Sequence, residues 1–144
     1  VDLAQLCRTM IEVYEPTATL REQTIVFDGP AKAIAQGEKN LLGQLIANLI
    51  ENALRHTGTG AAIWVALEAD KEDIVLSVTD NGPGIPQDER SRVTQRLYRL
   101  DRSRNTPGNG LGLSLVEAVA RLHNADLSLD DAAPGLRVTI RFSG

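Results

Sequence analysis

Two asparagines lie one helical turn apart in the stretch 38–56, which has the clearest helical periodicity in the chain. Asn48 and Asn52 are four residues apart, so their side chains lie one above the other on the polar face of the predicted helix. Asparagine is a mediocre helix former away from the caps, so two inside a helix need an explanation. Their carbonyl oxygens can hold Mg²⁺, a hard cation that keeps waters and binds substrate phosphates. An ordinary solvated helix face is the alternative explanation.

Two short glycine clusters enclose an arginine-rich stretch. The first cluster, residues 80–85 (DNGPGI), directly follows a predicted strand, and its leading acid can accept a hydrogen bond from the exocyclic amine of a flat ligand. The second cluster, residues 108–112 (GNGLG), precedes a predicted helix, where free N–H groups and the helix dipole favour an anion. Arginines suit phosphate recognition, and six of them lie between the clusters: Arg90, Arg92, Arg96, Arg99, Arg102 and Arg104.

Each of these features has an ordinary alternative, namely a tight turn, a helix cap or a solvated charged loop. The second cluster is not a Walker loop, because no Gly-Lys-Ser/Thr follows it, and it is not a dinucleotide fingerprint, because its spacing is GxGxG and no strand precedes it. In this order along the chain, however, the features together describe a single nucleotide pocket. The asparagines would hold magnesium, Asp80 would contact the adenine, and the arginine-rich loop and the second cluster would close on the phosphates.

The elements that must position these groups alternate between helices and hairpins. Hydrophobic periodicity predicts helices over 1–14, 38–56 and about 111–123. It predicts strands over 24–27, 61–69, 73–80, about 126–130 and 136–142. This order indicates an α+β fold, a two-layer α/β sandwich whose largely antiparallel sheet is covered by helices on one face.

Composition limits the possible classes of protein. The 144 residues suffice for one domain, predicted to span 1–144. A net charge of −4 and only 3% aromatic residues argue against a nucleic-acid partner. No apolar run approaches the roughly 20 residues of a membrane span, and the single cysteine, Cys7, is predicted to lie in the core.

These motifs resemble the catalytic and ATP-binding domain of bacterial two-component sensor histidine kinases, in the superfamily of gyrase, heat-shock chaperone, histidine kinase and mismatch-repair ATPases. Residues 48–57 (NLIENALRHT) are similar to the N box of the family, and 80–85 and 108–115 (GNGLGLSL) to its first and second glycine boxes. The resemblance covers essentially the whole chain. It implies a Bergerat-type ATP-binding fold, in which three helices cover a mixed sheet of about five strands and a lid covers the ATP.

The resemblance also implies roles for individual residues. Asn52 would be the principal Mg²⁺ ligand, with Asn48 beside it. Arg55 would approach the phosphates, and His56 the ribose or phosphate side. Asp80 would accept from the adenine amino group. The other expected nucleotide-binding residues are Gly82, Gly84, Ile85, Tyr98, Arg99, Gly108, Asn109, Gly110, Leu111, Gly112 and Leu113. The candidate catalytic residues are Asn48, Glu51 and Arg99, with Glu51 expected to polarise an acceptor histidine.

The chain departs from the family pattern at three places. Thr94 and Leu97 occupy positions where the family has phenylalanines, and Pro134-Gly135 is a thin third glycine box. Neither His56 nor His123 lies in a phospho-acceptor motif. We therefore expect the chain to be a fragment that lacks the dimerisation and phospho-acceptor domain.

The expected function is transfer of the γ-phosphoryl group of Mg-ATP to a histidine on that domain, for relay to the receiver domain of a response regulator. The fragment is expected to be monomeric and cytoplasmic, and the full-length protein a homodimer in the bacterial inner membrane. One alternative is an ATP hydrolase of the gyrase or chaperone type, but the position of its water-activating glutamate is Asn48 here. The other is a non-catalytic interaction module, suggested by the missing phenylalanines.

Overall fold

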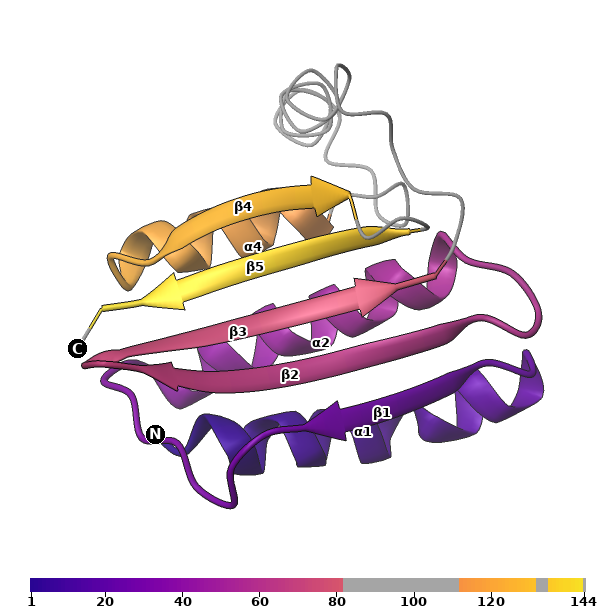
Figure 1. Cartoon of the computed structure of the whole chain (residues 1–144), viewed down its shortest axis with the longest axis horizontal. Helices are drawn as coiled ribbons and strands as arrows, with labels where there is room; N and C mark the ends of the chain where they lie inside the picture. Colours follow the sequence, from indigo (N-terminus) through magenta and orange to yellow (C-terminus); the bar gives the residue numbers. More distant parts are fainter. Residues whose placement is uncertain (82–111, 132–134, 144) are drawn as a thin grey trace.

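In the described part of the computed structural model, three helices lie against one face of a five-stranded sheet (Figure 1). The structure describes residues 1–81, 112–131 and 135–143. Its helices are α1 (Leu3–Leu20), α2 (Lys39–Arg55) and α4 (Gly112–Leu122). Its strands are β1 (Thr24–Asp28), β2 (Ala62–Asp70), β3 (Asp73–Asp80), β4 (Asp126–Asp131) and β5 (Leu136–Phe142).

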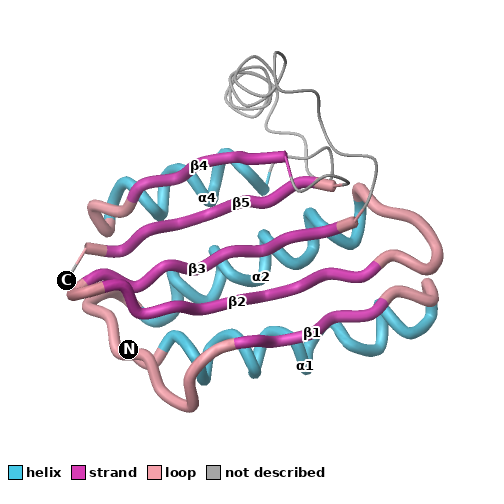
Figure 2. The backbone as a smooth tube through the Cα atoms, in the orientation of Figure 1, coloured by secondary structure: helices cyan, strands magenta, loops and turns pink. Residues whose placement is uncertain are grey.

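The strands follow the order β1-β2-β3-β5-β4, and Figure 2 shows the helices together behind this sheet. Only the β1–β2 pair is parallel, and the other three neighbouring pairs are antiparallel. The predicted two-layer α+β sandwich with a mixed, mostly antiparallel sheet is therefore confirmed. Among the described residues, no helix is long and apolar enough to cross a membrane.

The first helix is longer than predicted. It continues to Leu20 rather than ending at residue 14, and Pro16 lies inside it. The prediction was wrong because the turn beyond Pro16 is stabilised by contacts that periodicity does not reveal. Ala18 is buried in the core, and the backbone N–H of Arg21 closes the last turn on the carbonyls of Thr17 and Ala18.

The core lies between the helices and the sheet. The whole predicted apolar face of α2 is buried: Leu42, Leu45, Ile46, Leu49, Ile50, Ala53 and Leu54. Alternate residues of β2 face it from the sheet, namely Ile63, Val65 and Leu67. Cys7 is buried as predicted, and this burial raises the pKa of its thiol to about 12, so the thiolate nucleophile does not form at neutral pH. The packing of this core fixes where the polar C-terminal turn of α2 lies.

His123 connects the end of α4 to the start of α2. Its Nε2 accepts from the backbone N–H of Glu38 at 3.1 Å, and its Nδ1 lies 2.8 Å from the carbonyl oxygen of Val119. A Cβ atom at Gly37 would lie 2.6 Å from the His123 ring and 2.7 Å from a methyl group of Leu42. Only glycine fits at this position without moving the ring.

Replacing Gly37 by alanine should therefore lower the free energy of unfolding by about 1–3 kcal/mol, the usual cost of overpacking. Urea unfolding followed by circular dichroism measures it. Gly58→Ala is the matched control, because nothing lies within 4 Å of the Cβ that it adds. Equal stability of the two variants would show that the His123 contact is not tight.

Candidate nucleotide-binding site

The predicted site residues that the structure describes gather at one end of the molecule. The C-terminal end of α2, the end of β3 and the starts of α4 and β5 all lie there (Figure 1). The backbone N–H of Leu136, the first residue of β5, donates to Oδ1 of Asp80, the last residue of β3. Side chains from segments that are far apart in the sequence can therefore act on one ligand here.

Asn52 is buried, with 9% of its surface exposed, and Asn48 on the preceding turn is half-buried. The explanation of a solvated helix face is thus wrong for Asn52. Its Oδ1 has no hydrogen-bond partner in the part of the chain that the structure describes. A buried acceptor without a partner costs about 1–3 kcal/mol, so the fold retains it at the expense of stability. A neutral amide oxygen of this kind is a ligand that suits Mg²⁺.

Asp80 provides a carboxylate held at the end of its strand. The residue is 8% exposed, and its Oδ1 accepts from the Leu136 N–H at 3.3 Å. The next residue, Asn81, is also tethered, because its Oδ1 accepts from the Ala62 N–H at 2.8 Å. The position of the Asp80 carboxylate is fixed before any ligand arrives, as hydrogen-bond recognition of a base requires.

Gly135 precedes β5 at a position where the backbone requires a glycine. Its φ is +105°, a backbone conformation that glycine adopts readily and residues with a side chain rarely adopt. A Cβ atom there would lie 1.7 Å from the carbonyl oxygen of Asp80 and 3.0 Å from the Cα of Asn81. The start of β5 therefore lies against the backbone of the residue predicted to contact the adenine.

Gly135→Ala should lower the free energy of unfolding by about 2 kcal/mol more than Gly60→Ala, since the added methyl group also clashes with backbone. Gly60 has a φ of +85° but nothing within 4 Å of its Cβ, so it carries the backbone strain alone. Denaturant titrations of both variants give the difference. Equal denaturant midpoints for Gly135→Ala and Gly60→Ala would mean that β5 can move away from the end of β3 without loss of stability.

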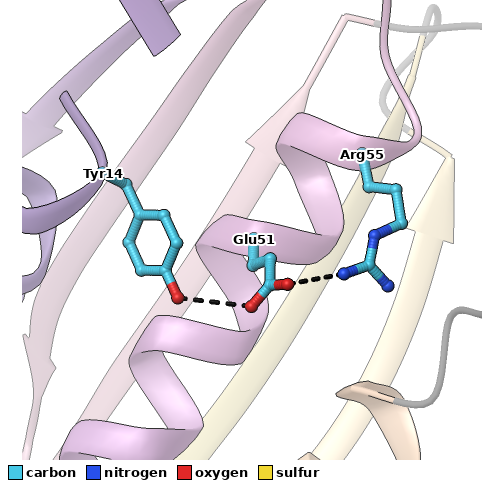
Figure 3. A network of polar contacts seen from close by, with 3 residues as sticks. All are labelled: Tyr14, Glu51 and Arg55. Atoms are coloured by element: carbon cyan, nitrogen blue, oxygen red, sulfur yellow. Dashed lines mark hydrogen bonds and ion pairs between the residues drawn. The ribbon is translucent and has the colours of Figure 1, made fainter. Parts of the chain in front are cut away.

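Glu51 lies between two partners rather than pointing into solvent. One oxygen of its carboxylate accepts from the Tyr14 hydroxyl at 3.2 Å, and the other pairs with Arg55. Figure 3 shows Glu51 between these two side chains. Desolvation and the charge of Glu51 raise the pKa of Tyr14, which therefore stays protonated and able to donate. Both carboxylate oxygens are occupied, and Arg55, predicted to approach the phosphates, is held by Glu51 in this state.

The family model of histidine kinase-, DNA gyrase B-, and HSP90-like ATPases matches residues 37–143, a stretch that includes Asn52, Asp80 and Gly135. The chain belongs to this family. The resemblance predicted from the sequence is confirmed, and ATP is the nucleotide for which the pocket of such a domain is built.

Curated relatives of this ATPase domain are sensor kinases. The adaptive-response sensory kinase SasA of Synechocystis sp. is 34% identical over 131 residues, which are 89% of this chain and 34% of SasA. The sensor protein CreC of Escherichia coli (strain K12) is 36% identical over 136 residues, 94% of this chain and 28% of CreC. The chain thus spans about a third of the length of the curated relatives it matches.

Solved structures of histidine kinases share the fold of this ATPase domain. The mycobacterial sensor histidine kinase MprB matches with a TM-score of 0.81 and 31% identity, over 100% of this chain and 97% of that one. The catalytic domain of histidine kinase ThkA matches with a TM-score of 0.83 over 99% of this chain and 94% of that one. At 19% identity, the second likeness concerns the fold alone.

Several predicted residues of the ATPase domain lie outside the described residues. These are Gly82, Gly84, Ile85, Tyr98, Arg99, Gly108, Asn109, Gly110 and Leu111, together with Thr94, Leu97 and the other arginines of that loop. Gly112 begins α4 as predicted, and Leu113 follows it in the first turn. The described part of the predicted site therefore comprises the asparagine pair, Glu51, Arg55, His56 and Asp80, together with Gly112 and Leu113 at the start of α4. Tyr14 and Gln23, which contact the same turn of α2, carry no motif signal and were missed by the sequence analysis.

His56 follows α2 directly, and the charges of Arg55 and Asp80 both act on its imidazole. Partial desolvation and the Arg55 charge lower the pKa of its imidazole, and Asp80 opposes this. Because its pKa is lowered, the neutral form of the imidazole predominates at pH 7 in the free protein. A bound phosphate nearby would raise its pKa again.

We expect nucleotide binding to take up a proton near pH 6.5, so that affinity rises as the pH falls toward the ordinary pKa of histidine. Calorimetry in buffers of different ionisation enthalpy measures this uptake. His56→Gln should abolish it. Uptake that persists in His56→Gln would assign the proton to another group.

Proposed function

We propose that this chain binds Mg-ATP and transfers the γ-phosphoryl group to a histidine on a separate dimerisation domain. One observation carries the proposal: a buried asparagine oxygen that has no partner in the described part of the chain lies at the same end of the fold as a buried carboxylate held by a backbone N–H. Membership of the ATPase family and the sensor kinases among the relatives support it.

In this proposal, Asn52, with Asn48 beside it, holds Mg²⁺, which when bound neutralises charge on the phosphates. Asp80 accepts from the adenine amino group and so orients the nucleotide. Arg55 and His56 lie near the phosphates, and the N-terminal end of α4, which begins at Gly112, favours an anion through its helix dipole. The glycines, Tyr98 and Arg99 of the undescribed stretch complete the pocket. The contribution of the protein to the rate is positioning and charge neutralisation.

The transfer itself breaks the bond between the γ-phosphorus and the bridging oxygen, which leaves with its electron pair on ADP. A new bond forms between phosphorus and a neutral imidazole nitrogen. Hydrolysis requires instead a base that activates water. Asn48, one turn before Asn52, is a neutral amide and cannot be that base. The carboxylate of Glu51 is already engaged by Tyr14 and Arg55, so it supports neither water activation nor, without rearrangement, the polarising role predicted for it.

The remaining partners follow from this activity. We infer that the acceptor histidine lies on a dimerisation domain of a longer homodimeric protein, and that a response-regulator receiver domain takes the phosphoryl group from it. The part represented by this chain would be monomeric alone. Because ATP is the phosphoryl donor, we place the domain in the cytoplasm, joined to a sensor in the bacterial inner membrane.

The proposal is tested by incubating the full-length protein with ATP labelled at the γ-phosphate. We expect label on the protein that is labile in acid and stable in base, as a phosphohistidine is. Labelled inorganic phosphate without labelled protein would instead identify a hydrolase. Absence of nucleotide binding by the folded chain at millimolar concentration would leave only the interaction module.

A further inference from the structure

Gln23 joins the turn after α1 to the C-terminal end of α2. Its side chain is buried, with 5% exposed, although the residue lies between a helix and a strand. Its Nε2 lies within hydrogen-bond distance of the Leu54 carbonyl oxygen (3.0 Å) and of the Thr57 carbonyl and hydroxyl oxygens (3.3 and 2.7 Å). One side chain therefore reaches three acceptors at the end of another helix.

These contacts close the turn of α2 that carries Asn52. The last carbonyl groups of a helix lack partners within the helix, and its end frays unless other groups supply them. Here Gln23 donates to the Leu54 carbonyl. The Thr57 hydroxyl accepts from Gln23 and donates to the Ala53 carbonyl at 2.8 Å. Ala53 directly follows Asn52 in the sequence, and Leu54 follows Ala53.

The backbone holds Gln23 on both sides, so the side chain is a rigid connection. The N–H of Gln23 donates to the Ala18 carbonyl at the end of α1, and the N–H of Thr24 donates to the Ala61 carbonyl beside β2. The preceding residue, Glu22, has a φ of 56° and accepts from the Gly60 N–H. Because the backbone of Gln23 is held in this way, movement of the end of α2 would have to break the side-chain bonds to Leu54 and Thr57.

The Gln23 side chain lowers the stability of the fold in a way that a purely packing side chain would not. Oε1 of Gln23 is buried and has no partner in the described part of the chain, as is also true of Oδ1 of Asn52. An apolar side chain of the same size would fill the space without an unpaired acceptor. We propose that Gln23 is a positioning residue for the metal-binding asparagine, holding the last turn of α2 closed so that Asn52 presents its oxygen to Mg²⁺. This inference rests on the proposed function.

The test replaces Gln23 by methionine, which has nearly the same shape and no polar hydrogens. Because Gln23→Met also removes the unpaired acceptor, the variant should still fold. Calorimetry with the non-hydrolysable ATP analogue AMPPNP, with Mg²⁺ and with chelator, gives the gain in affinity due to the metal. We expect this gain to fall about tenfold in Gln23→Met, as when other residues that orient a metal ligand are changed. Gln44→Met, on the exposed face of α2, is the matched control.

The affinity for AMPPNP measured without magnesium distinguishes a positioning role of Gln23 from a general structural role. It should stay unchanged in Gln23→Met, because the adenine contact through Asp80 lies on another element. The inference would be overturned if Gln23→Met lowered the AMPPNP affinity by the same factor with and without magnesium, or if it changed neither affinity. If wild-type chain binds no AMPPNP, the proposed function fails instead. Should Gln23→Met not fold, Thr57→Val provides the second test, since it removes the hydroxyl from the same contacts and should show the same selective loss.

Discussion

Asp80→Asn should reverse the preference of the site between adenine and hypoxanthine nucleotides. The Leu136 N–H holds Oδ1 of Asp80, so an asparagine at this position keeps its amide oxygen there and turns its NH₂ group the other way. That NH₂ would meet the amino group of adenine, and two donors cannot pair. Hypoxanthine has a carbonyl oxygen in place of that amino group and would accept instead.

An unpaired polar group in a buried contact costs about 1–3 kcal/mol, so affinity for ATP should fall by about 100-fold at most and affinity for ITP should rise. Competition calorimetry with both nucleotides in the presence of Mg²⁺ measures the two changes. Asp28→Asn is the matched control, because Asp28 also ends a strand but is exposed. If Asp80→Asn lowered the affinities for ATP and ITP equally, Asp80 would support the pocket without contacting the base.

Asn52→Ala should remove the magnesium dependence of nucleotide binding. The oxygen that the variant loses is buried and has no hydrogen-bond partner among residues 1–81, 112–131 and 135–143, so no contact described there depends on it. The loss of a metal ligand should reduce the gain in AMPPNP affinity that Mg²⁺ gives by at least about 100-fold, the upper range found when residues that merely orient ligands are changed. Calorimetry with and without chelator provides both affinities.

Asn40→Ala is the control for Asn52→Ala, because Asn40 lies on the same helix but is exposed. Thermal unfolding without nucleotide verifies that both variants fold. Removing an unpaired acceptor offsets part of the packing lost at Asn52, so its unfolding temperature should stay near that of the wild type. Retained magnesium dependence in a folded Asn52→Ala variant would place the metal ligand elsewhere.

Much of the fold follows from short-range pattern. The apolar stripe of α2 and the alternation in β2 and β3 predict elements whose bounds agree with the structure to within a residue or so. Burial of one face is a local property of each element, which the sequence displays directly. The order of Asn48, Asn52, Asp80 and the glycines likewise predicted a nucleotide pocket, and the resemblance of these motifs to known boxes predicted the ATPase family that the family model confirms.

Other features were decided only by contacts between distant segments. The turn of α1 beyond Pro16 depends on tertiary packing, and Gly135 is required by the backbone of Asp80, far away in sequence. The same is true of Glu51, whose carboxylate is engaged by Tyr14 from another helix, and of Gln23, which closes the end of α2. The residue types of a sequence indicate which groups can do chemistry. Which of those groups are buried, paired or left without a partner depends on what the folded chain brings beside them, and that determines their chemistry.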